Sequence, residues 1–140
     1  MPKQVYEKMG ITETQQVLVI DGPTEAVAAI ELPSITESPD LAFDHIILFT
    51  KSQSDLNKRF PQYKQRINAS GKLWVAWPKA GRLGTNLNIK EVIRIGYNHG
   101  LVESTNLRID DTWTALKFTH PKPGKTYKNS YGVLPESDSP

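Results

Sequence analysis

The chain has 140 residues, no cysteine and a formal net charge of +2. Its length suits one domain, and the absence of cysteine excludes thiolate catalysis, cysteine-bound zinc and iron–sulfur clusters. No signal peptide is visible at the N-terminus, and no apolar run approaches the ~20 residues that a membrane helix needs, so we expect a soluble, cytoplasmic protein without membrane contact.

Charge is distributed unevenly along the chain. Residues 1–50 hold two basic and eight acidic residues, whereas residues 51–94 hold ten basic and two acidic ones. Such polarity is typical of helices with solvated faces, and also of proteins that bind an anionic partner or pair with a second copy of themselves. The sequence therefore leaves a homo-oligomer open.

Two short apolar runs indicate central strands. Residues 16–21 (QVLVID) and 44–50 (DHIILFT) are rich in β-branched residues, as is typical of parallel strands that are covered on both faces. After the first run, residues 21–23 (DGP) predict a turn into a helix. The Pro- and Ser-rich residues 32–43 leave room for at most one short edge strand, near Ile35.

An amphipathic helix and a third strand follow the second run. The helix is predicted to begin at Ser52 and Asp55, to break or kink at Pro61 and to end at residues 70–71. Residues 72–77 (KLWVAW) then predict the third strand. The helix places apolar side chains on one face at helical spacing, namely Leu56, Phe60, Tyr63 and Ile67.

Capping residues predict one more helix. A glycine-containing loop spans residues 81–87, and Asn88 with Glu91 three residues later is typical of a helix start. Gly100 is expected to end this helix.

The last part of the domain is predicted to be a β-hairpin. Residues 101–109 and 113–119 alternate between apolar and polar side chains on either side of a short turn. Residues 121–140 are rich in proline and have no apolar period. We therefore expect a single domain over residues 1–120, followed by a flexible C-terminal tail.

The order of these elements predicts an α/β fold. Strands that alternate with helices form mainly parallel sheets with helices on both faces. The two strands of a hairpin are antiparallel to each other, so one of them runs against the sheet. We expect a three-layer, Rossmann-like domain whose mostly parallel sheet has five to six strands and includes a C-terminal antiparallel hairpin strand.

Several stretches resemble a known family. Residues 73–79 (LWVAWPK), 110–118 (DDTWTALKF) and 7–16 (EKMGITETQQ) are similar to the uncharacterised bacterial domain-of-unknown-function family 3052. The succession of elements in residues 71–118 resembles the closing half of a methyltransferase-type domain. The first resemblance implies no catalytic residues, whereas the second implies S-adenosylmethionine as a cofactor.

The residues that such a cofactor needs are not well matched. In the methyltransferase-type fold, a glycine-rich turn after the first strand approaches the ligand, and an acidic residue at the end of the second strand holds the ribose. Here the turn at residues 21–26 (DGPTEA) has one glycine, and Glu37 is the weak candidate for the acid. The sequence therefore predicts no cofactor.

A candidate binding rim follows from the predicted sheet. Open α/β sheets bind ligands beyond the carboxyl ends of their parallel strands. Carboxylates, an amine and indoles at this edge suit a small polar ligand, although the same residue types are also ordinary in turns and cores. The predicted rim comprises Asp21, Gly22, Ser52, Trp77, Lys79, Asp110, Asp111 and Trp113.

These observations favour a non-enzymatic domain that binds a protein or a small polar ligand at the rim. His45, His99 and His120 are expected at the opposite edge of the sheet, which disfavours a histidine-activated nucleophile and a zinc site. Neither catalytic residues nor metal ligands are assigned. Two alternatives stay open: a divergent S-adenosylmethionine-dependent, methyltransferase-like enzyme, and a nucleic-acid-binding domain that uses basic residues between positions 58 and 94.

Overall fold

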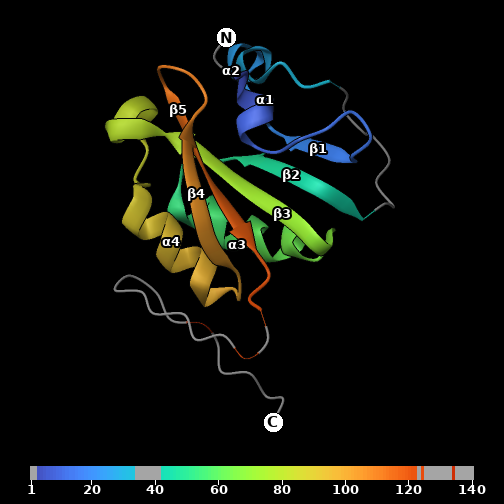
Figure 1. Ribbon diagram of the computed structural model, residues 1–140. Coiled ribbons are helices and arrows are strands. Elements are labelled where there is room, and N and C mark those ends of the chain that lie inside the picture. The colour runs from blue at the N-terminus through green and yellow to red at the C-terminus, as the bar shows by residue number, and fades with distance from the viewer. Residues whose placement is uncertain (1–2, 34–41, 123, 125–133, 135–140) are drawn as a thin grey trace.

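The computed structural model describes residues 3–33, 42–122, 124 and 134 (Figure 1). In this part of the chain, five strands form one sheet in the order β1-β2-β3-β5-β4. The strands are β1 (Val17–Ile20), β2 (Phe43–Phe49), β3 (Ile67–Pro78), β4 (Val102–Arg108) and β5 (Trp113–Thr119). The helices are α1 (Val5–Lys8), α2 (Thr24–Ile30), α3 (Gln53–Lys64), the 3-10 helix η1 (Lys79–Gly84) and α4 (Ile89–Asn98).

The direction of the strands confirms the predicted fold class. The pairs β1–β2 and β2–β3 are parallel, whereas β5 is antiparallel to both β3 and β4. Four of the five described strands therefore point the same way, and β5 runs against them. The edge strand that was predicted near Ile35 lies outside the described residues.

Helices cover the sheet on both sides and make it the middle of three layers (Figure 1). The buried side chains of α3 and α4 share one core with β2, β3 and β5. A second core on the other face contains the buried residues of α2 and of the segment after α1. Trp77 belongs to the first core and Trp74 to the second, as expected for residues three apart on one strand.

Helix α3 has no break at Pro61, and a break was one of the two outcomes predicted there. The helix continues through this residue to Lys64 without a break. Pro61 lies in the last turn of the helix and cannot donate one backbone hydrogen bond. The burial of Leu56 and Phe60 beneath the helix stabilises it by more than this loss costs. The Ser52 hydroxyl caps the other end by accepting a hydrogen bond from the backbone N–H of Asp55.

Strand β3 begins five residues earlier than predicted. Ile67, which was placed on the apolar face of the preceding helix, is instead paired with Phe43 of β2. Gly71 does not end a helix but lies inside the strand, next to an irregularity in its register with β2. A Cβ at this position would lie 2.8 Å from the carbonyl oxygen of Phe43, so the close approach of the two strands requires glycine.

The helix start at residue 88 is confirmed. The Asn88 side chain accepts a hydrogen bond from the backbone N–H of Glu91. The predicted C-terminal tail falls mostly outside the described residues and stays a prediction. One residue of it is described: Leu134 is partly buried and packs against the core beneath α3 and α4.

Candidate functional site

A hollow of about 440 Å³ opens at the carboxyl ends of β1 and β2. This is where ligands bind in open α/β sheets, and the volume lies within the range of ordinary small-molecule sites, ~300–1,000 Å³. The hollow is lined by the ends of β1 and β2, the start of α3 and the first residue of β5. Its lining residues are Asp21, Pro23, Phe49, Thr50, Lys51, Ser52, Asp55, Arg59 and Trp113.

A network of charges forms one wall of the hollow. The Arg59 guanidinium donates from Nη1 to Oδ2 of Asp21 at 2.7 Å and to Oδ2 of Asp55 at 3.2 Å. The Thr50 hydroxyl donates to the same Asp55 oxygen at 2.6 Å. Burial lowers the pKa of Arg59, but the two carboxylates raise it by more, so the guanidinium stays charged.

Asp21 and Arg59 differ in solvent exposure. The side chain of Asp21 is 70% exposed, whereas that of Arg59 is 16% exposed. Asp21 also adopts a left-handed backbone conformation, with φ of 54°, which is uncommon for a residue other than glycine. The chain thus holds an exposed carboxylate in a strained position at the mouth of the hollow.

Aromatic side chains contribute the apolar part of the lining. The rings of Phe49 and Trp113 meet edge to face, with centroids 5.2 Å apart and an interplanar angle of 72°. Both side chains are largely buried, so the hollow reaches only a small part of their surface. The site therefore combines opposite charges with an aromatic corner.

Gly22 was predicted to contact a ligand, but its role in the structure is packing. A Cβ on Gly22 would lie 2.4 Å from Cγ2 of Val27 and 2.8 Å from Cγ1 of Val19. The missing side chain thus lets α2 pack closely on the end of β1. Gly22 is needed for this packing, whether or not a ligand binds.

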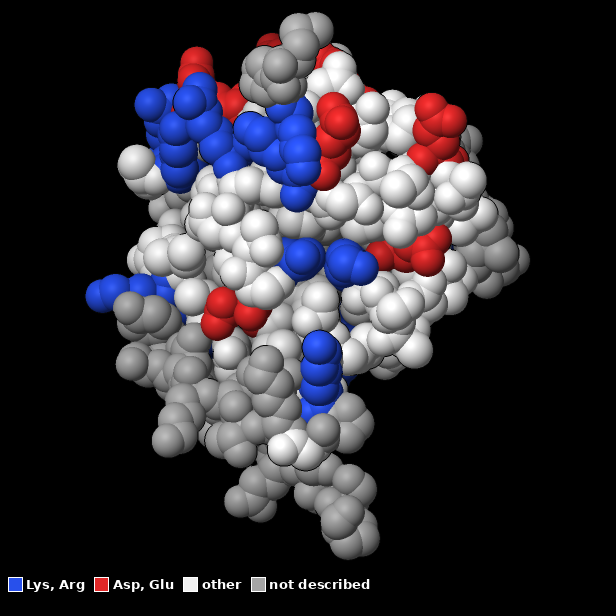
Figure 2. Space-filling view, in the orientation of Figure 1, with Lys and Arg blue, Asp and Glu red and all other residues white. Residues whose placement is uncertain are grey.

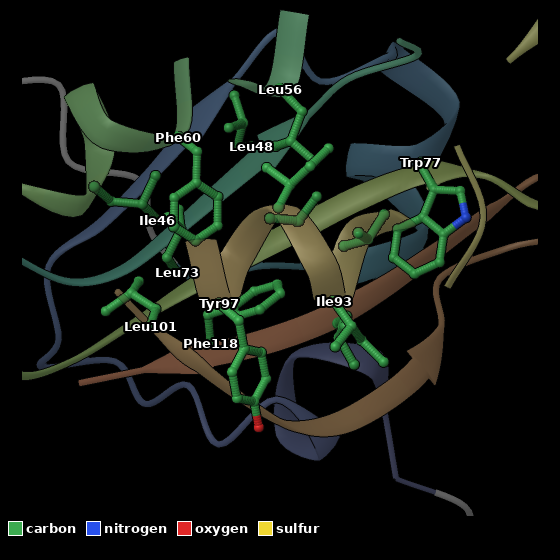
Figure 3. Packing of buried hydrophobic residues seen from close by; sticks show 14 of the residues in the cluster. Ile46, Leu48, Leu56, Phe60, Leu73, Trp77, Ile93, Tyr97, Leu101 and Phe118 are labelled. Carbon is green, nitrogen blue, oxygen red and sulfur yellow. The ribbon is translucent and has the colours of Figure 1, made fainter. Parts of the chain in front are cut away.

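Trp77 was expected to be partly covered at the rim, and that expectation is wrong. It is 3% exposed and packs in the core beneath α3 and α4, near Ile93 (Figure 3). The side chain at position 77 points to the face that these helices cover, so it cannot line a hollow beside Trp113, which belongs to the second core.

The other predicted rim residues lie away from the hollow. The backbone N–H of Lys79 donates to Thr112, and Lys79 opens η1 rather than lining the site. The Asp110 carboxylate accepts from the backbone N–H groups of Thr112 and Trp113, and Asp111 pairs with Arg108. These aspartates stabilise the β4–β5 turn.

The structure thus brings three of the predicted rim residues together, Asp21, Ser52 and Trp113, and separates the others from them. It also adds Phe49, Asp55 and Arg59, which the sequence analysis did not assign to the rim. A signal for the last two was present, because an acid and an arginine four residues apart lie on one face of the helix that follows a central strand.

The histidines lie apart from the hollow. His45 pairs with Val17 and Lys72 near the start of the parallel strands, and His99 follows α4, where its ring stacks on Phe60. His120 directly follows the C-terminal end of β5. The described residues contain no group of three side chains placed to hold a metal ion.

Basic residues between positions 58 and 94 are dispersed by the fold. Arg59 is paired at the hollow, whereas Lys64 at the other end of α3 donates to the carbonyl oxygen of His99. Arg94 pairs with Glu91 on α4. Figure 2 shows basic and acidic side chains mixed at the end of the molecule where Figure 1 places α1 and η1. A continuous basic stripe, as a nucleic acid would need, is not visible on this face among the described residues.

Comparisons with solved structures identify the fold. The chain is similar to a ribosomal protein L11 methylase from Lactobacillus delbrueckii subsp. bulgaricus, with TM-score 0.54 and 12% identity over 84% of this chain and 75% of that one. It is similar to a TehB-like SAM-dependent methyltransferase from Corynebacterium glutamicum, with TM-score 0.56 and 8% identity over 83% and 85%. A third match is LepI in complex with SAM, with TM-score 0.50 and 13% identity over 82% of this chain and 38% of that one.

The chain has the methyltransferase-like fold. No family model and no curated protein matches the sequence, so the resemblance to family 3052 stays a prediction. The prediction that there is no cofactor is contradicted by the solved structures, since two are methylating enzymes and one was solved with SAM. That prediction relied on the absence of a glycine-rich turn from this sequence. The fold is nevertheless shared with these structures at 8–13% identity, so the turn is a poor guide to the fold.

The sheet differs from a complete doubly wound sheet at one edge. A complete sheet has further strands on both sides of its first strand, as in the order 3-2-1-4-5-6. Here β1 is the outer strand of the described sheet. The hollow accordingly lies on the side of β1 that faces β2 and α3. None of the described helices is long and apolar enough to cross a membrane.

Proposed function

We propose that this domain binds S-adenosylmethionine as a methyltransferase-like protein. The observation that carries the proposal is the position of the hollow: it opens at the carboxyl ends of β1 and β2, and an exposed carboxylate, Asp21, directly follows β1. The likeness to solved S-adenosylmethionine-dependent methyltransferases supports this function over a domain without a cofactor.

The lining of the hollow fits the charged end of this cofactor. S-adenosylmethionine carries an ammonium group, a carboxylate and a sulfonium ion, and the sulfonium makes its methyl group electrophilic. The Asp21 carboxylate is placed to accept from an ammonium group, and Lys51 and Arg59 are placed to bind a carboxylate. The small part of the Trp113 ring that the hollow reaches adds an attraction for a cation.

In this proposal, Arg59 would position the ligand by binding its carboxylate. The Arg59 guanidinium uses Nη1 for both of its carboxylate partners. Its other nitrogens donate to none of the described residues in these contacts, so a ligand can bind them. The contact with Asp55 and the stacking of Arg59 over the Tyr63 ring hold the guanidinium in place. A preorganised arginine loses little entropy when it binds a carboxylate.

Calorimetry with purified protein tests the proposal. We expect S-adenosylmethionine and its demethylated product to bind with micromolar affinity, and a ligand concentration of 100 times Kd to stabilise the protein by about 2.7 kcal/mol. Arg59→Gln should weaken binding at least about tenfold through loss of a charged contact. Lys58→Gln, which removes an exposed charge one residue away, is the matched control.

Two results would contradict the proposal. The first is no heat and no thermal stabilisation at millimolar S-adenosylmethionine. The second is binding that Arg59→Gln and Lys58→Gln weaken equally, because this would place the ligand outside the hollow or show only non-specific attraction to basic residues.

A further inference from the structure

Two lysines stand next to each other on the sheet face that carries Trp74. In the antiparallel pairing of β3 and β5, Trp74 is opposite Lys117, and Lys72 is opposite Thr119. Lys72 and Lys117 are therefore diagonal neighbours on the same face, a spacing that long side chains can bridge. Both are half-buried, and both lie far along the strands from the hollow at the end of β2.

Neither amine forms an ion pair with a carboxylate among the described residues, although the charge of Asp44 attracts Lys72. The Lys117 ammonium lies 5.8 Å from the centre of the Trp74 ring, and Lys72 donates to the carbonyl oxygen of Ser70. Asp44 is the acidic group near Lys72, but its two oxygens accept from Gln16 and Asn68.

This environment lowers the pKa of Lys117. Partial burial lowers the pKa of Lys117, and the positive charge of Lys72 lowers it further. The Trp74 ring favours the ammonium form and opposes these effects, although the net direction is downward. A lysine beside a second cation is a recognised way to obtain a nucleophilic amine near neutral pH.

We propose that Lys117 is an acyl-accepting nucleophile and that Lys72 binds the leaving group of an acyl phosphate. The neutral Nζ of Lys117 attacks the carbonyl carbon, so that a C–N bond forms and the C–O bond to phosphate breaks. Phosphate leaves with the bonding electron pair, beside the Lys72 ammonium. The amine proton passes to the departing phosphate, which is released as the dianion HPO4²⁻, and the product is an uncharged amide on Lys117.

The choice of an acyl phosphate follows from the pair of amines. One amine supplies the nucleophile, and the other supplies a fixed positive charge that a dianionic leaving group requires. An acyl donor whose leaving group carries less negative charge would gain from the nucleophile but less from the Lys72 ammonium. The two parts of the proposal can therefore be separated by the choice of donor.

Acetylation rates of individual lysines test the proposal. The folded full-length protein is treated at pH 7.5 with acetyl phosphate, and initial rates at each lysine are measured by peptide mass spectrometry. We expect Lys117 to react several-fold faster than the exposed Lys58 on α3. Lys72→Gln should lower the Lys117 rate by about tenfold, as the loss of a charged contact to the leaving group implies, without changing the rate at Lys58.

A second donor and a second variant complete the test. With an N-hydroxysuccinimide ester, Lys72→Gln should lower the Lys117 rate less than with acetyl phosphate, and Lys72→Arg, which keeps the charge, should retain most of the rate with both donors. A Lys117 rate no higher than that of Lys58 would overturn the nucleophile. Equal effects of Lys72→Gln with both donors, or loss of rate in Lys72→Arg, would overturn the role of Lys72 in binding the leaving group.

Discussion

The indole N–H of Trp74 on β3 donates a hydrogen bond to Nδ1 of His45 on β2, at 3.2 Å in the buried interior. Because indole nitrogen is only a donor, Nδ1 of His45 must be the unprotonated nitrogen of the ring. The proton is therefore on Nε2, which lies 3.1 Å from Oε1 of Gln15 and donates to it. This chain fixes the tautomer of His45 and links the segment before β1 to the centre of the sheet.

His45 should make stability depend on pH. Burial is the main cause that lowers its pKa to about 4, with Lys72 and Lys117 acting in the same direction and Asp44 opposing them. Between pH 6.5 and about 4 the unfolded chain takes up a proton at His45 that the native protein does not. The free energy of unfolding should therefore fall by about 3 kcal/mol as the pH is lowered through this window.

Denaturant unfolding at several pH values measures this effect, and variants assign it. His99 and His120 also have lowered pKa values, so they add to the slope in the same direction. His45→Gln should remove most of the slope between pH 6.5 and 4, whereas His99→Gln should remove a smaller part. If His45→Gln unfolds with the same pH dependence as the unmodified protein, the buried neutral histidine is not its cause.

Trp77 should behave as a core residue, like Trp74. The two side chains are 3% and 0% exposed. Replacing either with alanine leaves a large cavity, so we expect each variant to lose ~3–5 kcal/mol in urea unfolding. A Trp77→Ala variant that keeps nearly full stability would show that this end of β3 is open to solvent, contrary to its packing beneath α3 and α4.

Gly22→Ala should destabilise the protein by ~1–3 kcal/mol, since the added methyl group has no space between Val19 and Val27. Thermal unfolding measures the change, and Ala29→Gly on α2 is a useful comparison because it alters backbone freedom without adding volume. If Gly22→Ala were neutral in stability but changed ligand affinity, the glycine would serve the ligand rather than the packing of α2.

The sequence was informative wherever a local pattern determines the structure. The apolar runs of β1 and β2, the Asn88 cap and the turn before Trp113 depend on neighbours in the chain, and each is found where it was predicted. Trp77 could not be placed in this way. Its burial depends on α4, which returns to the sheet from a later part of the chain.

In the candidate site, too, only the residues set by local sequence could be predicted. Asp21 and Ser52 follow strands and could be placed at the rim from their positions alone. The role of Arg59 could not, because it depends on an ion pair across 38 residues of sequence, between the end of β1 and the second turn of α3. The prediction of no cofactor, which the solved structures contradict, took a sequence fingerprint as a requirement of the fold.

Asp21 and Asp55 should separate ligand binding from stability. Both carboxylates contact Arg59, but Asp55 also accepts from the buried hydroxyl of Thr50, so Asp55→Ala should cost ~1–3 kcal/mol by leaving that donor unpaired. Asp21 is exposed, and a pair of this kind contributes at most ~1 kcal/mol. Its left-handed backbone would be relaxed by glycine, which offsets the loss by a similar amount.

Asp21→Gly is therefore expected to fold with nearly unchanged stability while it removes the carboxylate from the mouth of the hollow. In urea unfolding its midpoint should match that of the unmodified protein, and in calorimetry its affinity for S-adenosylmethionine should fall at least about tenfold, as the loss of a charged hydrogen bond implies. Equal affinity in Asp21→Gly and the unmodified protein would show that the strained aspartate does not contact the ligand. The left-handed conformation would then reflect only the tight turn between β1 and α2.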